Sequence, residues 1–173
     1  MTFIEFLNWL LKVLCRGSNH NGGSNEDKPV EFGVCRDIDI LNFWDKHKVS
    51  WTAGPKFGME DTWFHYPLEA ADWLEVYYDY ATICPPYTPN TEEEAGFDCD
   101  DFADGFASWA KVYSERILGK RVNAAWEIWG ETPQGAHAWN AVKAGDGMYE
   151  IEPQTGEVWV FGSNPGYKAI IAK

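Results

Sequence analysis

Three residues of reactive types occur along the chain in the order that a thiol-dependent catalytic triad uses. Cys99 lies in the segment FDCDDFA, His137 in GAHAWN and Glu152 in YEIEPQ. A cysteine becomes a nucleophile when a histidine takes its proton and a carboxylate orients the histidine ring. The order therefore predicts a Cys99–His137–Glu152 triad that transfers an acyl group through a thioester.

The segment around Cys99 carries the signals of a helix start. Asp98 is a favourable N-cap residue, and Asp101 stands where the acid of a capping box stands. Cys99 is then the first helical residue, where the positive end of the helix dipole favours a thiolate. Asp98, Asp100 and Asp101 oppose that effect, because nearby negative charge disfavours the ionised thiol. An inert buried cysteine is the alternative reading of Cys99 taken by itself.

The same segment predicts a buried helix that ends at Gly119. Its apolar residues recur at helical spacing, and alanines form a second face that lets a neighbouring element approach closely; they are Phe102, Phe106, Trp109, Tyr113, Ala103, Ala107 and Ala110. The acids at its start also offer oxygen ligands for calcium, at Asp98, Asp100, Asp101 and Asp104. An ordinary acidic helix start explains the same four residues, so no cofactor is expected and calcium is the alternative.

Strands are expected to position His137 and Glu152. Residues 122–129 and 138–143 are rich in strand-forming types, and a turn with proline and glycine lies between them. His137, Trp139 and Ala141 then share one face, so that the indole shields the imidazole from water. A tight turn at residues 145–147 leads into residues 148–152, which places Glu152 opposite His137.

These residues resemble the transglutaminase-like branch of the papain-like cysteine peptidase superfamily over roughly Thr91 to Gly156. The resemblance rests on Asp98-Cys99 opening a helix, on residues 118–122 before a strand, on His137-Ala138-Trp139-Asn140 and on Ile151-Glu152-Pro153. It implies an α+β fold with a papain-like core, in which a buried helix with the cysteine at its N-terminus packs on an antiparallel sheet that carries the histidine and the acid.

The resemblance also implies roles for the site residues. Cys99 is the nucleophile, His137 the general base, and Glu152 the third member, where the family commonly has an aspartate before proline. The Cys99 backbone N–H is one oxyanion donor, and the side chain of Asn90 or of Gln154 is a candidate for the second. The implied enzyme is a cysteine peptidase, isopeptidase or amidase acting on a peptide or protein.

Two alternatives to that enzyme remain open at this point. A transglutaminase, a deamidase or a peptidoglycan amide hydrolase would use the same triad, and fold does not choose among them. A catalytically silent protein-binding module of the same fold would use none of it. Ligand binding that survives Cys99→Ala is the observation expected of that module.

Charge and composition limit the partners and the number of domains. Acidic residues outnumber basic ones 27 to 14, giving a net charge of −13, which disfavours nucleic acid because such a surface repels phosphate. We expect an apolar helix over residues 1–16, a Gly- and Ser-rich linker over residues 17–28 and a single catalytic domain over residues 29–173. Two further helices are expected, from Asp37 to His47 and from Pro67 to about Ala81.

The N-terminal helix and the cysteines indicate in which cellular compartment the protein is expected. The helix is too short for a bilayer and lacks the basic start of a secretory signal, so it docks on the domain, on a partner or on a membrane surface. The four cysteines, Cys15, Cys35, Cys84 and Cys99, show no CxxC spacing. Pairing all of them would consume the reactive thiol, so we expect a reducing compartment, the cytoplasm.

Overall fold

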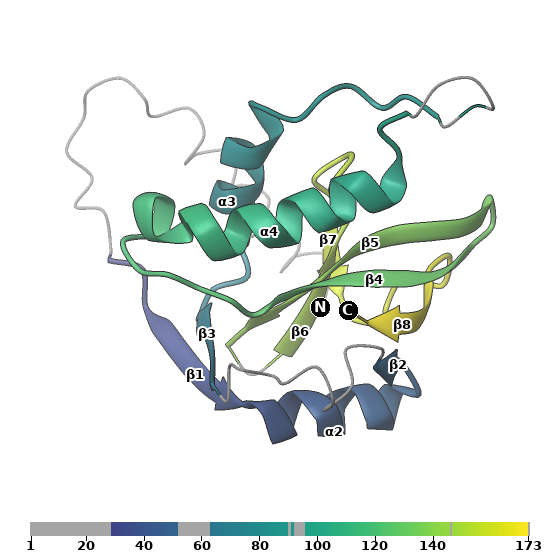
Figure 1. Ribbon diagram of the computed structural model, residues 1–173. Helices are drawn as coiled ribbons and strands as arrows, with labels where there is room; N and C mark the ends of the chain where they lie inside the picture. The colour runs from purple at the N-terminus through teal and green to yellow at the C-terminus, as the bar shows by residue number, and fades with distance from the viewer. Residues whose placement is uncertain (1–28, 52–62, 90, 92–95, 146, 173) are drawn as a thin grey trace, which may run out of the picture.

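The computed structural model describes residues 29–51, 63–89, 91, 96–145 and 147–172 (Figure 1). The expected helix over residues 1–16, the linker over residues 17–28 and Asn90 lie outside this range. The elements follow in the order β1 (Phe32–Arg36), α2 (Asp37–His47), β2 (Ser50–Trp51), β3 (Trp63–Pro67), α3 (Asp72–Ala81), α4 (Cys99–Leu118), β4 (Ala125–Thr132), β5 (Gly135–Ala144), β6 (Gly147–Ile151), β7 (Val158–Val160) and β8 (Lys168–Ala172).

The strands form one large sheet and one small one. The six-stranded sheet has the order β2-β8-β4-β5-β6-β7, and all its pairings are antiparallel except that of β2 with β8. Strands β1 and β3 pair antiparallel as a separate ribbon. Asn123 ties this ribbon to the start of β4, because its side chain accepts from the His65 N–H and donates to the Trp63 carbonyl.

Helix α4 crosses one face of the large sheet, and α2 lies on the opposite side (Figure 1). The face of the sheet toward α4 contributes Val142, Ala144 and Ile151 to a core shared with α3 and α4. The other face contributes Trp139, Ala141 and Met148 to a second core shared with Ile40 and Trp44 of α2. The sheet is therefore covered on both faces, and alternate residues of β5 belong to different cores.

The boundaries of α4 confirm the predicted helix. Asp98 and Asp101 form the capping box, and Gly119 ends the helix in the left-handed region at φ 80°. The start of α3 differs from the prediction, because Pro67 ends strand β3 and the helix begins only at Asp72. Pairing of Pro67 with Phe32 of β1 accounts for the difference, since a contact with a distant strand outweighs a local helix signal.

The fold class is α+β, as expected, with a helix that begins at Cys99 and packs on an antiparallel sheet. The papain-like core that the resemblance implied is not confirmed by this arrangement. No helix in the described part of the chain combines the length and the apolar character that crossing a bilayer requires.

Candidate functional site

The structure brings His137 and Glu152 together. The imidazole Nε2 lies 2.7 Å from Glu152 Oε2, and the side chains are 18% and 4% exposed. The same carboxylate oxygen accepts a hydrogen bond from the Tyr167 hydroxyl at 3.2 Å, and Glu152 Oε1 accepts from the Gln154 backbone N–H. Glu152 is thus held by three donors, which fixes the orientation of the imidazole.

Aromatic rings enclose the imidazole of His137. Trp139 lies nearly parallel to it, with centroids 6.1 Å apart and an interplanar angle of 19°. Tyr167 meets the imidazole edge-on at 5.9 Å and Trp139 at 5.2 Å. The predicted shielding of His137 by Trp139 is present, and Tyr167 adds a second ring that the sequence did not single out. We call His137, Glu152, Trp139, Tyr167 and Trp159 the histidine cluster.

Cys99 reaches the sheet beside this cluster. Its thiol accepts a hydrogen bond from the backbone N–H of Ala138, the residue after His137. Within the described residues, no hydrogen bond joins the Cys99 sulfur to the His137 ring. Asn140 of β5 bonds to the Ala103 carbonyl of α4, whereas His137 stacks on Trp139, which belongs to the other core. The thiol contacts the backbone of β5 at the residue next to His137.

The surroundings of Cys99 favour the neutral thiol. Burial raises the pKa of Cys99 above its ordinary value of 9.0, and the charges of Asp98 and Asp100 raise it further. The hydrogen bond from the Ala138 N–H lowers this pKa, and so does the Cys99 backbone N–H, but the net direction is upward. Burial and the two aspartates therefore outweigh the groups that lower this pKa, in line with the opposing effect of the acids that the sequence indicated.

We expect iodoacetamide to alkylate Cys99 more slowly at pH 8 than it alkylates a cysteine in an unstructured peptide. A raised pKa leaves less thiolate, which is the reacting species. Peptide mass spectrometry after timed quenching measures the rate at each site. Cys84 is the internal control, because burial raises its pKa too. Labelling of Cys99 faster than the peptide would contradict the expectation.

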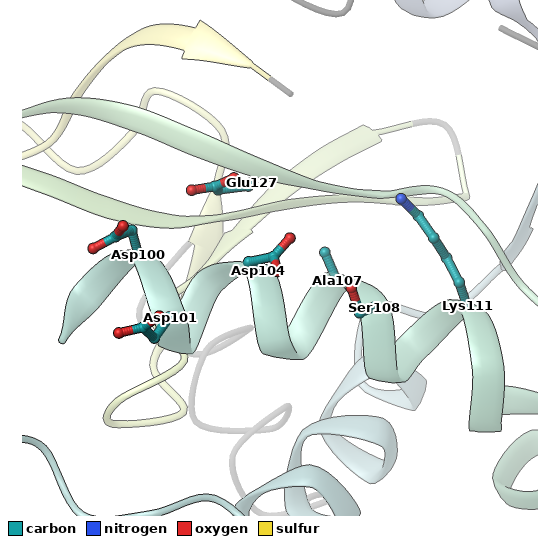
Figure 2. Close-up of a pocket in the computed structure, with 7 residues that line it drawn as sticks. All are labelled: Asp100, Asp101, Asp104, Ala107, Ser108, Lys111 and Glu127. Carbon is teal, nitrogen blue, oxygen red and sulfur yellow. The ribbon is translucent and has the colours of Figure 1, made fainter. Parts of the chain in front are cut away.

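A pocket of about 400 Å³ opens between the first half of α4 and strand β4 (Figure 2). Figure 2 shows Glu127 on β4 across from Asp100 and Asp104 on α4. The lining residues are Asp100, Asp101, Asp104, Ala107, Ser108, Lys111 and Glu127. Sequence analysis singled out three of these acids but missed Glu127, which becomes their neighbour only when β4 packs on α4.

Metal-binding geometry is present at the helix start. Ligand atoms of Asp98, Cys99 and Asp100 lie within 4.8 Å of one another. Asp98 and Asp101 already have a structural role as the capping box of α4. The expectation of no cofactor and its alternative, calcium at these acids, both stay untested predictions. Calorimetry with calcium decides it: a saturable heat that Asp100→Asn removes would establish the site, and no heat would eliminate it.

The other predicted site residues have separate outcomes. The Gln154 side chain has a buried Nε2 with no hydrogen-bond partner within the described residues. Its role as an oxyanion donor stays a prediction, as does that of Asn90. Cys35, Cys84 and Cys99 are free thiols, whereas Cys15 is outside the described part of the chain. Glu150 was also missed, although it lies two residues before Glu152 and so shares its face of the strand.

Solved structures similar to this chain include the following two. One is a Polyporus squamosus lectin bound to the human-type influenza-binding epitope Neu5Aca2-6Galb1-4GlcNAc, with 19% identity, a TM-score of 0.49 and coverage of 72% of this chain and 41% of that chain. The other is PSL1a in complex with E64, with 18% identity, a TM-score of 0.55 and coverage of 80% and 50%. No protein-family model and no curated protein matches the chain.

The solved structure that matches with a TM-score of 0.55 shares a fold with this chain, which spans about half of its length. PSL1a is a lectin rather than a transglutaminase or a papain-like peptidase, so the predicted assignment to those enzymes is corrected. The predicted cysteine peptidase or hydrolase activity and the peptide substrate are corrected with it.

Proposed function

We propose that this chain is a non-catalytic carbohydrate-binding module whose site is the histidine cluster. One observation carries the proposal: the imidazole of His137 is held by Glu152 in one orientation among aromatic rings. Its Nε2 faces Glu152 at 2.7 Å and so carries the proton that the carboxylate accepts. A neutral imidazole with a proton on Nε2 has an acceptor at Nδ1, and within the described residues no protein group bonds to that atom.

A ligand hydroxyl suits this acceptor. Sugar hydroxyls both donate and accept, so one of them can donate to Nδ1 of His137 while another accepts from a nearby N–H. A few placed polar groups among aromatic rings are typical of small-ligand sites.

Charge narrows the kind of carbohydrate. The net charge of the chain is −13, and acids surround the start of α4 next to Ala138. A carboxylate on the ligand would be repelled by this field, whereas an uncharged sugar would not. We therefore propose a neutral oligosaccharide rather than an acidic one.

The shared fold with PSL1a, a lectin, gives further support to a binding role. At 18% identity the likeness concerns the fold, and the chain spans 50% of PSL1a. The proposal of a binding site therefore rests on the residues of the histidine cluster. The fold shared with PSL1a is the reason for proposing carbohydrate as the class of ligand.

Isothermal titration with a set of neutral and sialylated oligosaccharides tests the proposal. We expect a neutral member to bind, and we expect Glu152→Gln to weaken its binding by roughly tenfold or more, because the partly buried imidazole loses a charged partner. Tyr167→Phe is the milder variant, since it removes only the hydroxyl that donates to Glu152. Cys99→Ala is expected to leave the affinity within about twofold, because the proposed ligand contacts are made by the imidazole and the aromatic rings and not by the thiol.

Two results would contradict this proposal. One is an absence of binding by every oligosaccharide in a preparation whose circular dichroism and thermal melt show a folded protein. The other is cleavage of a peptide that Cys99→Ala abolishes, which would give the thiol a role that the proposed function does not include.

A further inference from the structure

A second carboxylate lies behind the histidine cluster and is almost inaccessible to solvent. Glu150 of β6 is 1% exposed. It accepts three hydrogen bonds: from the Trp139 indole N–H at 2.9 Å, from the Trp159 indole N–H at 2.6 Å and from the Gly162 backbone N–H at 2.9 Å. No salt bridge to Glu150 occurs within the described residues. Its charge is therefore balanced by N–H dipoles alone.

Two of these donors, Trp139 and Trp159, connect Glu150 to the His137–Glu152 pair. Trp139 lies parallel to the imidazole of His137. Trp159 contacts the ring of Tyr167 at 4.7 Å, and the Tyr167 hydroxyl donates to Glu152. The Glu150 carboxylate thus holds two indoles in place. One is stacked on the imidazole of His137, and the other contacts Tyr167, which donates to Glu152.

Stability alone does not account for a carboxylate at this position. Burial raises the pKa of Glu150, although the N–H groups of Gly162, Trp139 and Trp159 lower it, which shows that the ionised group is held at an energetic cost. An apolar core would carry no such cost. A glutamine could not replace it either, because its amide has one acceptor oxygen and an NH₂ that would face an indole N–H.

We infer that Glu150 is a positioning residue for the ligand site, holding Trp139 and Trp159 so that the His137–Glu152 pair keeps one orientation. The part of this inference that concerns ligand affinity rests on the proposed function. The part that concerns the orientation of His137 does not, because it is measured without a ligand.

Glu150→Gln tests the inference, with Asp79→Asn as the matched control. Asp79 also accepts an indole N–H, from Trp109 at 2.9 Å, but it lies on α3, and the side-chain partners recorded for its carboxylate among the described residues are Trp109 and Arg116. Two-bond ¹H–¹⁵N NMR of the histidine rings reports which nitrogen of His137 carries the proton. We expect wild type and Asp79→Asn to show a single Nε2–H form and Glu150→Gln to show a mixture.

Affinity gives the second measurement. We expect Glu150→Gln to weaken binding of the neutral oligosaccharide by roughly tenfold, with Asp79→Asn within about twofold of wild type. If Glu150→Gln does not fold, Trp159→Phe takes its place, because it keeps a ring beside Tyr167 and removes one donor to Glu150. A smaller shift in the same direction is expected from that variant.

The outcomes separate the two proposals. A change in the His137 proton position without any oligosaccharide binding in wild type would support the role of Glu150 and overturn the carbohydrate function. Oligosaccharide binding by wild type together with an unchanged His137 ring in Glu150→Gln, or in Trp159→Phe, would support the function and overturn the positioning role.

Discussion

Replacing Trp139 with alanine is expected to lower the free energy of unfolding by about 3–5 kcal/mol, a large share of the roughly 5–15 kcal/mol that a domain of this size has. The indole is fully buried in the core shared with α2. Its removal leaves a cavity beside Tyr167 and removes one of the three donors that balance the buried charge of Glu150. Chemical denaturation followed by circular dichroism measures the change.

Trp63→Ala is the control for this prediction. Trp63 lies on strand β3, and its side chain is 52% exposed. Within the described residues its ring has one recorded aromatic or cationic contact, the Arg36 guanidinium, which lies 5.9 Å from the ring centroid. Its loss should cost less than about 1 kcal/mol. Trp139→Phe should fall between the two, because it keeps a ring but loses the N–H. Equal costs for Trp139→Ala and Trp63→Ala would show that Trp139 is not a central core residue.

Gly130→Ala is expected to destabilise the protein by about 3 kcal/mol, at the upper end of the usual cost of overpacking. A Cβ at Gly130 would lie 2.2 Å from the Lys168 carbonyl oxygen and 2.5 Å from the Trp139 ring. Both neighbours are fixed, since one is the backbone of β8 and the other is a buried indole. Strand β8 must move away from β4, so their hydrogen bonds weaken together.

Gly166→Ala controls for the general effect of adding a methyl group. The nearest atom to its Cβ would be Asn164 Oδ1 at 3.3 Å, the end of a side chain that can turn aside. We expect a change of less than about 1 kcal/mol at this position. Thermal melts of both variants give the comparison, and a cost of Gly130→Ala as small as that of Gly166→Ala would contradict the predicted clash.

Local signals determined how much of the fold the sequence could predict. The start of α4 depends on two side chains, Asp98 and Asp101, that bond to backbone groups three residues away, and its end depends on Gly119. Such signals can be recognised in the sequence. The strand ending at Pro67 and the pairing of β2 with β8 depend on residues far along the chain, so no local pattern indicated them.

The sequence predicted that His137 and Glu152 would lie close together, but it did not predict the groups that surround them. The tight turn between β5 and β6 brought Glu152 to His137, as the period-two pattern predicted. The contact of Cys99 with the Ala138 N–H depends on how α4 packs on β5, where Asn140 bonds to the Ala103 carbonyl. Trp159 lies on β7 and Tyr167 directly before β8, and their place beside His137 and Glu152 follows from the tertiary fold.

The position of β8 between β2 and β4 has a consequence for how the chain folds. Strands β4 to β7 are joined by short connections and can pair early, because each closes only a small loop. Until β8 arrives, β4 has an open edge with unpaired backbone groups and the apolar residues Ile128 and Trp129. An open apolar edge is the feature through which partly folded chains associate, so docking of β8 protects the protein from aggregation as well as completing the sheet.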